Sequence, residues 1–158
     1  MKNQPLLFTC SLDSLQETQK WALTIAALLE KFDVLALKGN LGAGKTTFAR
    51  FLIQSLTSAH QEVPSPTFTL VQSYETQKGL FFHFDCYRLE SPLEVLELGI
   101  EDAFTSGISL IEWPEKIDIF LPPNTLLLEF ENTSSRRLKI YGNQLWKERL
   151  TPFLSIQS

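Results

Sequence analysis

The sequence predicts an α/β fold: a P-loop NTPase-like three-layer sandwich in which helices cover both faces of a mixed sheet. Short apolar runs alternate with helix-like stretches along the chain, which is typical of βαβ units around a parallel core. Residues 77–79 form only a short turn between two of these runs, so the two should pair antiparallel. We therefore expect a parallel core with antiparallel strands at the edges.

The first strands and helices are expected in the N-terminal third. Residues 6–10 read as a short strand, and residues 14–17 (Ser-Leu-Gln-Glu) match a capping box at the start of a helix. Apolar residues then recur at helical spacing, so this helix should run to about Lys31. Residues 33–38 are the next expected strand, and residues 45–57 the next helix.

A polar, proline-stiffened loop at residues 58–66 leads into two strands, 68–75 and 80–87. Gly99 is a plausible helix stop between two short helical stretches. We expect the late hairpin to lie on one edge of the sheet. The remaining expected elements are helices at 93–98, 101–105 and 144–154, a loop or short helix from Pro114, and strands at 108–113, 125–130 and 138–141.

Composition indicates one globular domain spanning residues 1–158. The chain has 158 residues, of which 44% are hydrophobic and 20% charged, with a net charge of −4. This acidic balance does not support nucleic-acid binding by the chain alone. Cys10 and Cys86 lie in apolar runs and are expected to be buried thiols. Without a visible signal peptide or membrane-length apolar run, we expect a cytoplasmic protein with no membrane partner.

Residues 39–46 read Gly-x-x-x-x-Gly-Lys-Thr, the P-loop pattern, between an apolar strand and a helix. Glycines without a Cβ let backbone N–H groups point at a triphosphate, and the helix N-terminus adds its positive dipole end. Lys45 should contact the β and γ phosphates, and the Thr46 hydroxyl is placed to bind Mg²⁺. The expected nucleotide contacts in this loop are Asn40, Leu41, Gly42, Ala43, Gly44, Lys45, Thr46 and Thr47.

Two acids end apolar strands and could complete the site. Asp85 follows residues 81–84 and Glu112 follows residues 108–111, which places both carboxylates beside the crevice where open α/β sheets bind ligands. Spacing does not decide which acid binds metal and which positions water. Each could instead cap a nearby helix. Thr67, in a stiff Ser-Pro-Thr loop, could reach the γ-phosphate as switch loops do, or belong to an ordinary turn.

Other residues near these motifs favour structural roles. His83 alternates with core positions and is expected to be a hydrogen-bonded core histidine. Trp113 could line the site, although packing is the stronger expectation. Arg136 and Arg137 could reach the nucleotide or a partner, although a solvated hairpin is the stronger expectation. Residues 115–118 lack the amide that begins a guanine-specificity motif, which favours ATP over GTP.

Four motifs together resemble the bacterial TsaE family. They occur in the order Gly-Asn-Leu-Gly-Ala-Gly-Lys-Thr-Thr (39–47), Ser-Pro-Thr-Phe (65–68), His-Phe-Asp-Cys-Tyr-Arg-Leu (83–89) and Ile-Glu-Trp-Pro-Glu (111–115). The resemblance covers nearly the whole chain, and the combination is far more specific than the P-loop alone. Cys86 stands at a position where variation is expected.

The resemblance implies a Mg²⁺-dependent ATPase that resets the TsaB–TsaD complex during threonylcarbamoyladenosine modification of tRNA. Its cofactors would be ATP and Mg²⁺, and tRNA would be contacted only indirectly, through the partner proteins. Thr46 and Glu112 become Mg²⁺ ligands, Asp85 an acid needed for hydrolysis, Thr67 part of a switch-like loop and Lys45 a phosphate ligand. Independently of the resemblance, Ser11 and Arg137 are suggested for the adenine side, because the first strand and the late hairpin are expected at the sheet edges.

Two other functions remain open from the residues. A small-molecule P-loop kinase would need an arginine-bearing lid, and the arginines of this chain form no such cluster. A non-hydrolysing module that binds ATP to dock a partner would show stable occupancy without turnover. Because no arginine finger is evident within the chain, we expect low activity in isolation.

Overall fold

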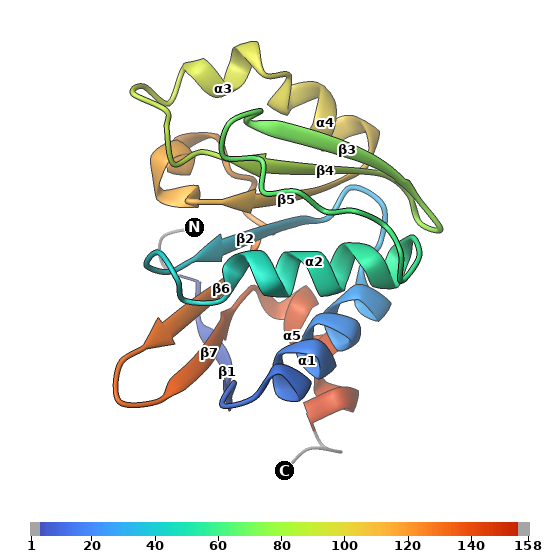
Figure 1. Cartoon of the computed structure of the whole chain (residues 1–158), viewed down its shortest axis with the longest axis vertical. Coiled ribbons are helices and arrows are strands. Elements are labelled where there is room, and N and C mark those ends of the chain that lie inside the picture. Colours follow the sequence, from blue (N-terminus) through green and yellow to red (C-terminus); the bar gives the residue numbers. More distant parts are fainter. Residues whose placement is uncertain (1–3, 155–158) are drawn as a thin grey trace.

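The computed structural model describes residues 4–154. Seven strands form one sheet in the order β1-β7-β6-β2-β5-β4-β3 (Figure 1). Strands β2, β5, β4 and β6 make the parallel pairs, whereas β1 with β7, β7 with β6, and β3 with β4 pair antiparallel. The mixed sheet is thus confirmed. The strands are β1 (Leu6–Ser11), β2 (Val34–Lys38), β3 (Val71–Thr76), β4 (Gly79–Asp85), β5 (Ile108–Glu112), β6 (Leu126–Asn132) and β7 (Arg136–Tyr141).

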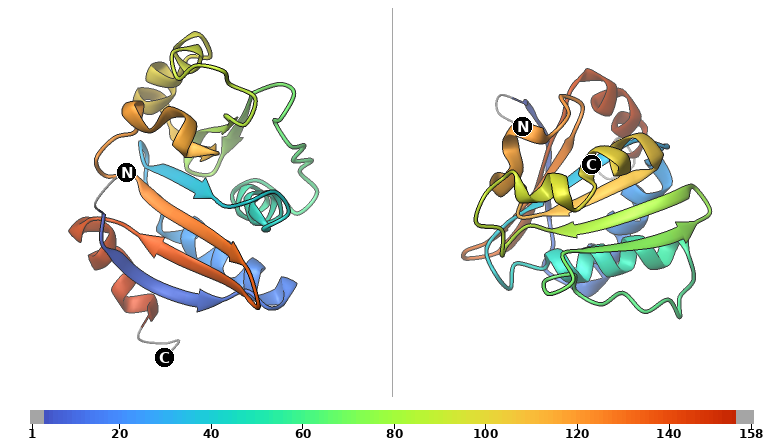
Figure 2. Two further views of the ribbon diagram at one scale, coloured as in Figure 1. Left: turned by 90° about the vertical axis from the view of Figure 1, so that its left-hand side faces the viewer. Right: turned by 90° about the horizontal axis from the view of Figure 1, so that it is seen from above.

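Helices cover both faces of the central strands. They are α1 (Leu15–Leu28), α2 (Lys45–Leu56), α3 (Glu94–Glu97), α4 (Ile100–Ser106), α5 (Gln144–Leu154) and a 3₁₀ helix, η1 (Pro114–Phe120). In the left view of Figure 2, α3 and α4 lie near the upper end of the molecule and α1 and α5 near the lower end. No helix within residues 4–154 is long and apolar enough to cross a membrane.

Two apolar clusters separate the layers. Leu110 belongs to the cluster that includes buried residues of α1, α2 and α5, whereas Ile111 belongs to the cluster with α3, α4 and η1. Adjacent residues on a strand point to opposite faces, so the clusters lie on opposite sides of the sheet. Strands β2 and β5 are buried on both faces, which explains their continuous apolar sequence. The three-layer prediction is confirmed.

The start of α1 follows its sequence signal, but its end does not. The Ser14 hydroxyl accepts a hydrogen bond from the Glu17 backbone N–H at 3.1 Å, as the capping pattern predicts. The helix ends at Leu28, not near Lys31, because Leu29 takes an extended conformation (φ −65°, ψ 140°). The prediction was therefore about one turn too long.

The strand predicted at residues 68–75 begins later, at Val71. Residues 66–70 instead form a turn, in which the Leu70 N–H donates to the Pro66 carbonyl at 2.6 Å. Leu70 has a positive φ of 70°, a conformation incompatible with a strand. The loop that carries Thr67 consequently extends further than the alternating sequence pattern suggested.

The hairpin of β6 and β7 lies one position inside the predicted edge. β6 pairs with β2, β7 pairs with β6, and β1 forms the outermost strand beyond β7. The antiparallel edges are confirmed, but β1 rather than the late hairpin closes this side. Five apolar side chains of β6 and β7 are buried in the α1–α2–α5 cluster: Leu126, Leu128, Phe130, Leu138 and Ile140.

Strand register brings the predicted acids together. Glu112 at the end of β5 is paired with Leu37 of β2 on one side and with Asp85 of β4 on the other. Because the three strands are parallel, their carboxyl ends open onto the same edge of the sheet as the P-loop.

Candidate functional site

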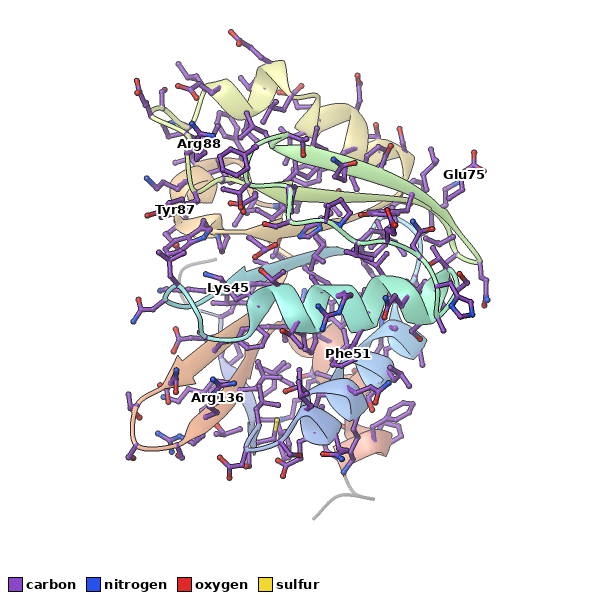
Figure 3. The ribbon with its side chains drawn as sticks, in the orientation of Figure 1. Lys45, Phe51, Glu75, Tyr87, Arg88 and Arg136 are labelled. Atoms are coloured by element: carbon purple, nitrogen blue, oxygen red, sulfur yellow. The ribbon has the colours of Figure 1, made fainter. Side chains whose placement is uncertain are left out.

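A cavity of about 370 Å³ lies where the P-loop meets the ends of β4 and β5. In Figure 3, Tyr87, Lys45 and Arg136 lie one below another along this side of the molecule. The cavity draws on five separate stretches of chain, joined by the fold. It is lined by Leu41, Gly42, Ala43, Gly44, Lys45, Thr46, Thr47, Ser65, Thr67, Asp85, Tyr87, Glu112, Trp113 and Arg136.

Two P-loop positions require glycine, one because of its backbone conformation and the other because of a close backbone contact. Gly44 precedes the first residue of α2 in the left-handed region, with φ 105°. A Cβ on Gly39 would lie 2.8 Å from the backbone oxygen of Phe130, a distance that side chains do not reach without displacement. The first residues of α2 line the cavity, and the unpaired N–H groups of a helix N-terminus suit an anion there.

Lys45 is nearly buried, at 5% exposure. Its ammonium group donates a hydrogen bond to the Gly39 carbonyl and lies 3.7 Å from the centre of the Trp113 ring. Burial lowers the pKa of Lys45, while the carboxylates of Glu112, Glu115 and Asp85 oppose this change by attracting the charged form. The site therefore holds a cation surrounded by acids.

Asp85 connects two loops that border the cavity. One carboxylate oxygen accepts a hydrogen bond from the Thr67 hydroxyl at 2.9 Å, and the other accepts from the Tyr87 backbone N–H at 2.9 Å. The Ser65 and Thr67 hydroxyls are 2.7 Å apart. Asp85 thus fixes the Thr67 loop and the loop after β4 relative to each other.

Glu112 is buried at the end of the central strand β5, with 2% exposure. One of its oxygens, Oε2, lies 2.6 Å from Nε2 of His83 on the neighbouring strand. His83 is fully buried, so its prediction as a hydrogen-bonded core histidine is confirmed. Its hydrogen-bond partner, Glu112, is one of the predicted site residues.

An aromatic pair covers one side of the cavity. The rings of Tyr87 and Trp113 are 4.8 Å apart, and Trp113 in turn covers the Lys45 ammonium. Trp113 has a left-handed backbone conformation, with φ 60° and ψ 52°. This turn at the end of β5 directs the ring back over the P-loop lysine.

Three predicted contacts lie outside this cavity. Asn40 and Arg137 line a neighbouring cavity of about 350 Å³ together with residues of β6. Arg137 also pairs with Glu131 at 3.1 Å. The Ser11 hydroxyl donates to Asp13 at 2.7 Å, and Ser11 lines neither cavity.

Arg136, Tyr87 and Ser65 line the cavity but were not among the predicted site residues. For Arg136 a signal existed: successive residues of a strand point to opposite faces, so only one of Arg136 and Arg137 can face the phosphate cavity. The sequence does not reveal which, because the strand register against β6 decides it. Tyr87 follows Asp85 by two residues and belongs to the same motif, residues 83–89.

The donor atoms in the cavity fit a magnesium ion. Thr46 offers a hydroxyl and Glu112 a carboxylate, and Mg²⁺ takes one or two such protein oxygens beside water and phosphate. Within residues 4–154 there is no group of three or more His, Cys, Asp or Glu side chains arranged to hold a metal ion.

Comparisons with known proteins agree on one family. The sequence model described as "Threonylcarbamoyl adenosine biosynthesis protein TsaE" matches residues 12–139. The tRNA threonylcarbamoyladenosine biosynthesis protein TsaE of Rickettsia felis is 41% identical over 120 residues, which cover 76% of this chain and 70% of the relative. The Aquifex aeolicus protein of the same name is 39% identical over 139 residues, or 86% and 97% of the two chains. The crystal structure of Bacillus subtilis YdiB aligns with a TM-score of 0.75 and 26% identity over 99% of both chains.

Proposed function

Because the chain belongs to the TsaE family of tRNA threonylcarbamoyladenosine biosynthesis, we propose that it is a Mg²⁺-dependent ATPase of that pathway. Its turnover would reset a TsaB–TsaD complex between rounds of tRNA modification. The observation that carries this proposal is the convergence of Lys45, Thr46, Asp85 and Glu112 on one cavity at the N-terminus of α2.

The side chains divide the work as the geometry allows. The N–H groups at the start of α2 and the Lys45 ammonium hold the phosphates and stabilise charge on the transferred phosphoryl group. Asp85 would orient the attacking water, and Thr67, which donates a hydrogen bond to Asp85, lines the same cavity. Thr46 and Glu112 would hold Mg²⁺, which neutralises phosphate charge when bound.

The partner role rests on the family and on charge. The chain carries a net charge of −4, which disfavours direct binding to the tRNA backbone. TsaB and TsaD would therefore supply the contacts to tRNA, and tRNA would reach this chain only through them. Among residues 4–154, Arg136 is the only arginine that lines the cavity, so we expect partners to raise a low basal rate.

Phosphate release from ATP tests the proposal. Purified chain is measured alone and with TsaB plus TsaD, for wild type, Lys45→Ala and the exposed control Lys31→Ala. We expect partners to raise the rate and Lys45→Ala to lower it by about 100-fold or more, since it removes a charge that stabilises the transition state. The control should match wild type.

Different outcomes would favour the alternatives. If partners leave the rate unchanged, the resetting role is wrong and only nucleotide hydrolysis survives. If labelled γ-phosphate appears on a metabolite rather than as free phosphate, the chain is a kinase. If ATP stays bound without turnover even with both partners, the chain is a nucleotide-gated binding module.

A further inference from the structure

His83 is a fully buried polar side chain with one polar contact. Its Nε2 lies 2.6 Å from Oε2 of Glu112, and both side chains are at most 3% exposed. Its other ring nitrogen, Nδ1, is buried and has no hydrogen-bond partner among residues 4–154. A carboxylate accepts hydrogen bonds, so Nε2 is the nitrogen that carries the proton and donates it.

This arrangement is costly as a packing solution. His83 lies on β4 between residues buried in the apolar core, Phe81 and Phe84 among them. An apolar side chain would fill such a position without burying an unpaired nitrogen, which destabilises the folded chain. Among residues 4–154, the only polar contact of the His83 side chain is with Glu112, so the reason for a histidine is to be sought in that carboxylate.

The Glu112 carboxylate is also attracted to the Lys45 ammonium, in competition with its contact to His83. It is the acid with the largest stabilising effect on the charged form of Lys45, ahead of Glu115 and Asp85. If Glu112 were free to rotate, it could form an ion pair with Lys45. Lys45 would then be less available to phosphate, and Glu112 less available to the metal. The hydrogen bond from His83 holds one carboxylate oxygen on the β4 side of the site.

We propose that His83 is a positioning residue that fixes the Glu112 carboxylate so that its second oxygen serves Mg²⁺ and stays separate from Lys45. This inference rests on the proposed Mg²⁺–nucleotide function of the cavity. It assigns His83 no contact with substrate. Partners of this kind orient metal-binding carboxylates, and their removal weakens metal binding by about 10- to 100-fold.

The test uses two amide substitutions of similar polarity. In His83→Gln the side-chain amide nitrogen can occupy roughly the place of Nε2 and donate to Glu112, whereas in His83→Asn it falls short. Binding of Mn²⁺ to the ADP-bound chain is measured by electron paramagnetic resonance, and binding of ADP in excess chelator by calorimetry. Ser109→Ala, which removes another buried and unpaired polar atom on β5, is the control.

We expect His83→Asn to weaken Mn²⁺ binding by about tenfold or more while changing metal-free ADP affinity by less than about twofold. His83→Gln and Ser109→Ala should stay within about threefold of wild type for both. A purely structural role would affect the two amides alike and lower both affinities together, which would overturn the inference.

The same measurements separate this inference from the proposed function. If wild type binds Mn²⁺ and ADP but His83→Asn behaves as wild type, the positioning role is wrong and the nucleotide site stands. If wild type binds ADP with no dependence on metal, the proposed function and the inference fall together. Thermal unfolding of each variant checks folding, and the Gln variant alone still tests the role if Asn does not fold, because loss of Mn²⁺ binding by Gln would contradict it.

Discussion

The Lys45 ammonium has two partners inside the protein, the Gly39 carbonyl and the face of Trp113. Each interacts with a cation more weakly than phosphate oxygens do, so binding of a triphosphate should replace them. Trp113 holds its left-handed conformation at a cost of about 1–3 kcal/mol, which the packing of Tyr87 against its ring helps to offset. At the scale of single residues, the lysine is kept in place before its ligand arrives.

The thiols give a residue-scale prediction about pH. Burial raises the pKa of Cys86 to about 12. The unfolded chain loses this proton near its ordinary pKa of 9.0, so unfolding is favoured as pH rises between that value and about 12. In Cys86→Ala, the free energy of unfolding should fall less steeply between pH 9 and 10.5, by up to about 1.4 kcal/mol per pH unit.

Urea unfolding at several pH values measures this slope. The slope, rather than the absolute stability, is compared, because Cys86→Ala also creates a small cavity. Ser73→Ala, which removes an exposed hydroxyl with no ionisation in this range, should keep the wild-type slope. Equal slopes for all three proteins would show that Cys86 does not titrate abnormally.

Some site residues could be predicted individually and others could not. Lys45, Asp85 and Glu112 have signals confined to a few neighbouring positions, and the fold gathers them in one cavity. Strand alternation indicates that only one of Arg136 and Arg137 can face the cavity, but which one depends on the pairing of Arg136 with Asn132 across the hairpin. The link between His83 and Glu112 spans two strands and follows only once their register is known.

At the scale of elements, the C-terminal end of α1 is capped by a side chain from another part of the chain. Lys78, in the turn between β3 and β4, donates hydrogen bonds to the carbonyl oxygens of Ala26, Ala27 and Leu29 at 2.8–2.9 Å. These carbonyls belong to the last turn of α1 and to its cap, where a cation is favoured. The sequence of α1 alone therefore suggested a longer helix.

Lys78→Met should destabilise the protein by about 1–3 kcal/mol, because it leaves these carbonyls without their charged donor. Chemical denaturation measures the loss. Lys20→Met removes the same charge from the exposed side of α1 and should cost less than about 0.5 kcal/mol. If both variants lose equal stability, the effect is one of net charge and not of capping.

The loop before β3 was harder to predict than the strands around it. Alternation of polar and apolar residues extends back to residue 68, yet Leu70 turns with a positive φ and its carbonyl accepts from the Asp85 N–H at 3.0 Å. This hydrogen bond joins segments 15 residues apart, and it overrides the strand that the alternating sequence pattern predicts. An element's length is thus decided here by tertiary contacts.

At the scale of the whole molecule, Arg149 connects the C-terminal helix α5 to the loop between α1 and β2. Its guanidinium contacts both carboxylate oxygens of Asp33 at 2.6 and 3.2 Å and that of Glu30 at 2.6 Å. Asp33 is 3% exposed, so it depends on this partner. The fold class was predictable from periodicity and motifs, but this closure was not, because it joins side chains 116 residues apart.

Arg149→Met should lower the free energy of unfolding by about 3 kcal/mol, since it removes the cation that is hydrogen-bonded to both oxygens of a buried carboxylate. Lys147→Met, an exposed change on the same helix, is the matched control. Combining Arg149→Met with Asp33→Asn should cost less than the sum of the two single changes when measured in urea. Additive losses would show that the two residues do not act as a pair.

The pairing of β1 with β7 also determines the order in which the chain can fold as it is synthesised. β1 ends at Ser11, and its partner β7 ends at Tyr141. At roughly 5–20 residues per second, the first strand emerges from the ribosome on the order of ten seconds before its partner exists. The P-loop, β4 and β5 are complete by residue 112, so the phosphate-binding half can assemble while β1 is still unpaired. Closing the sheet with β1 is therefore among the last steps of biogenesis.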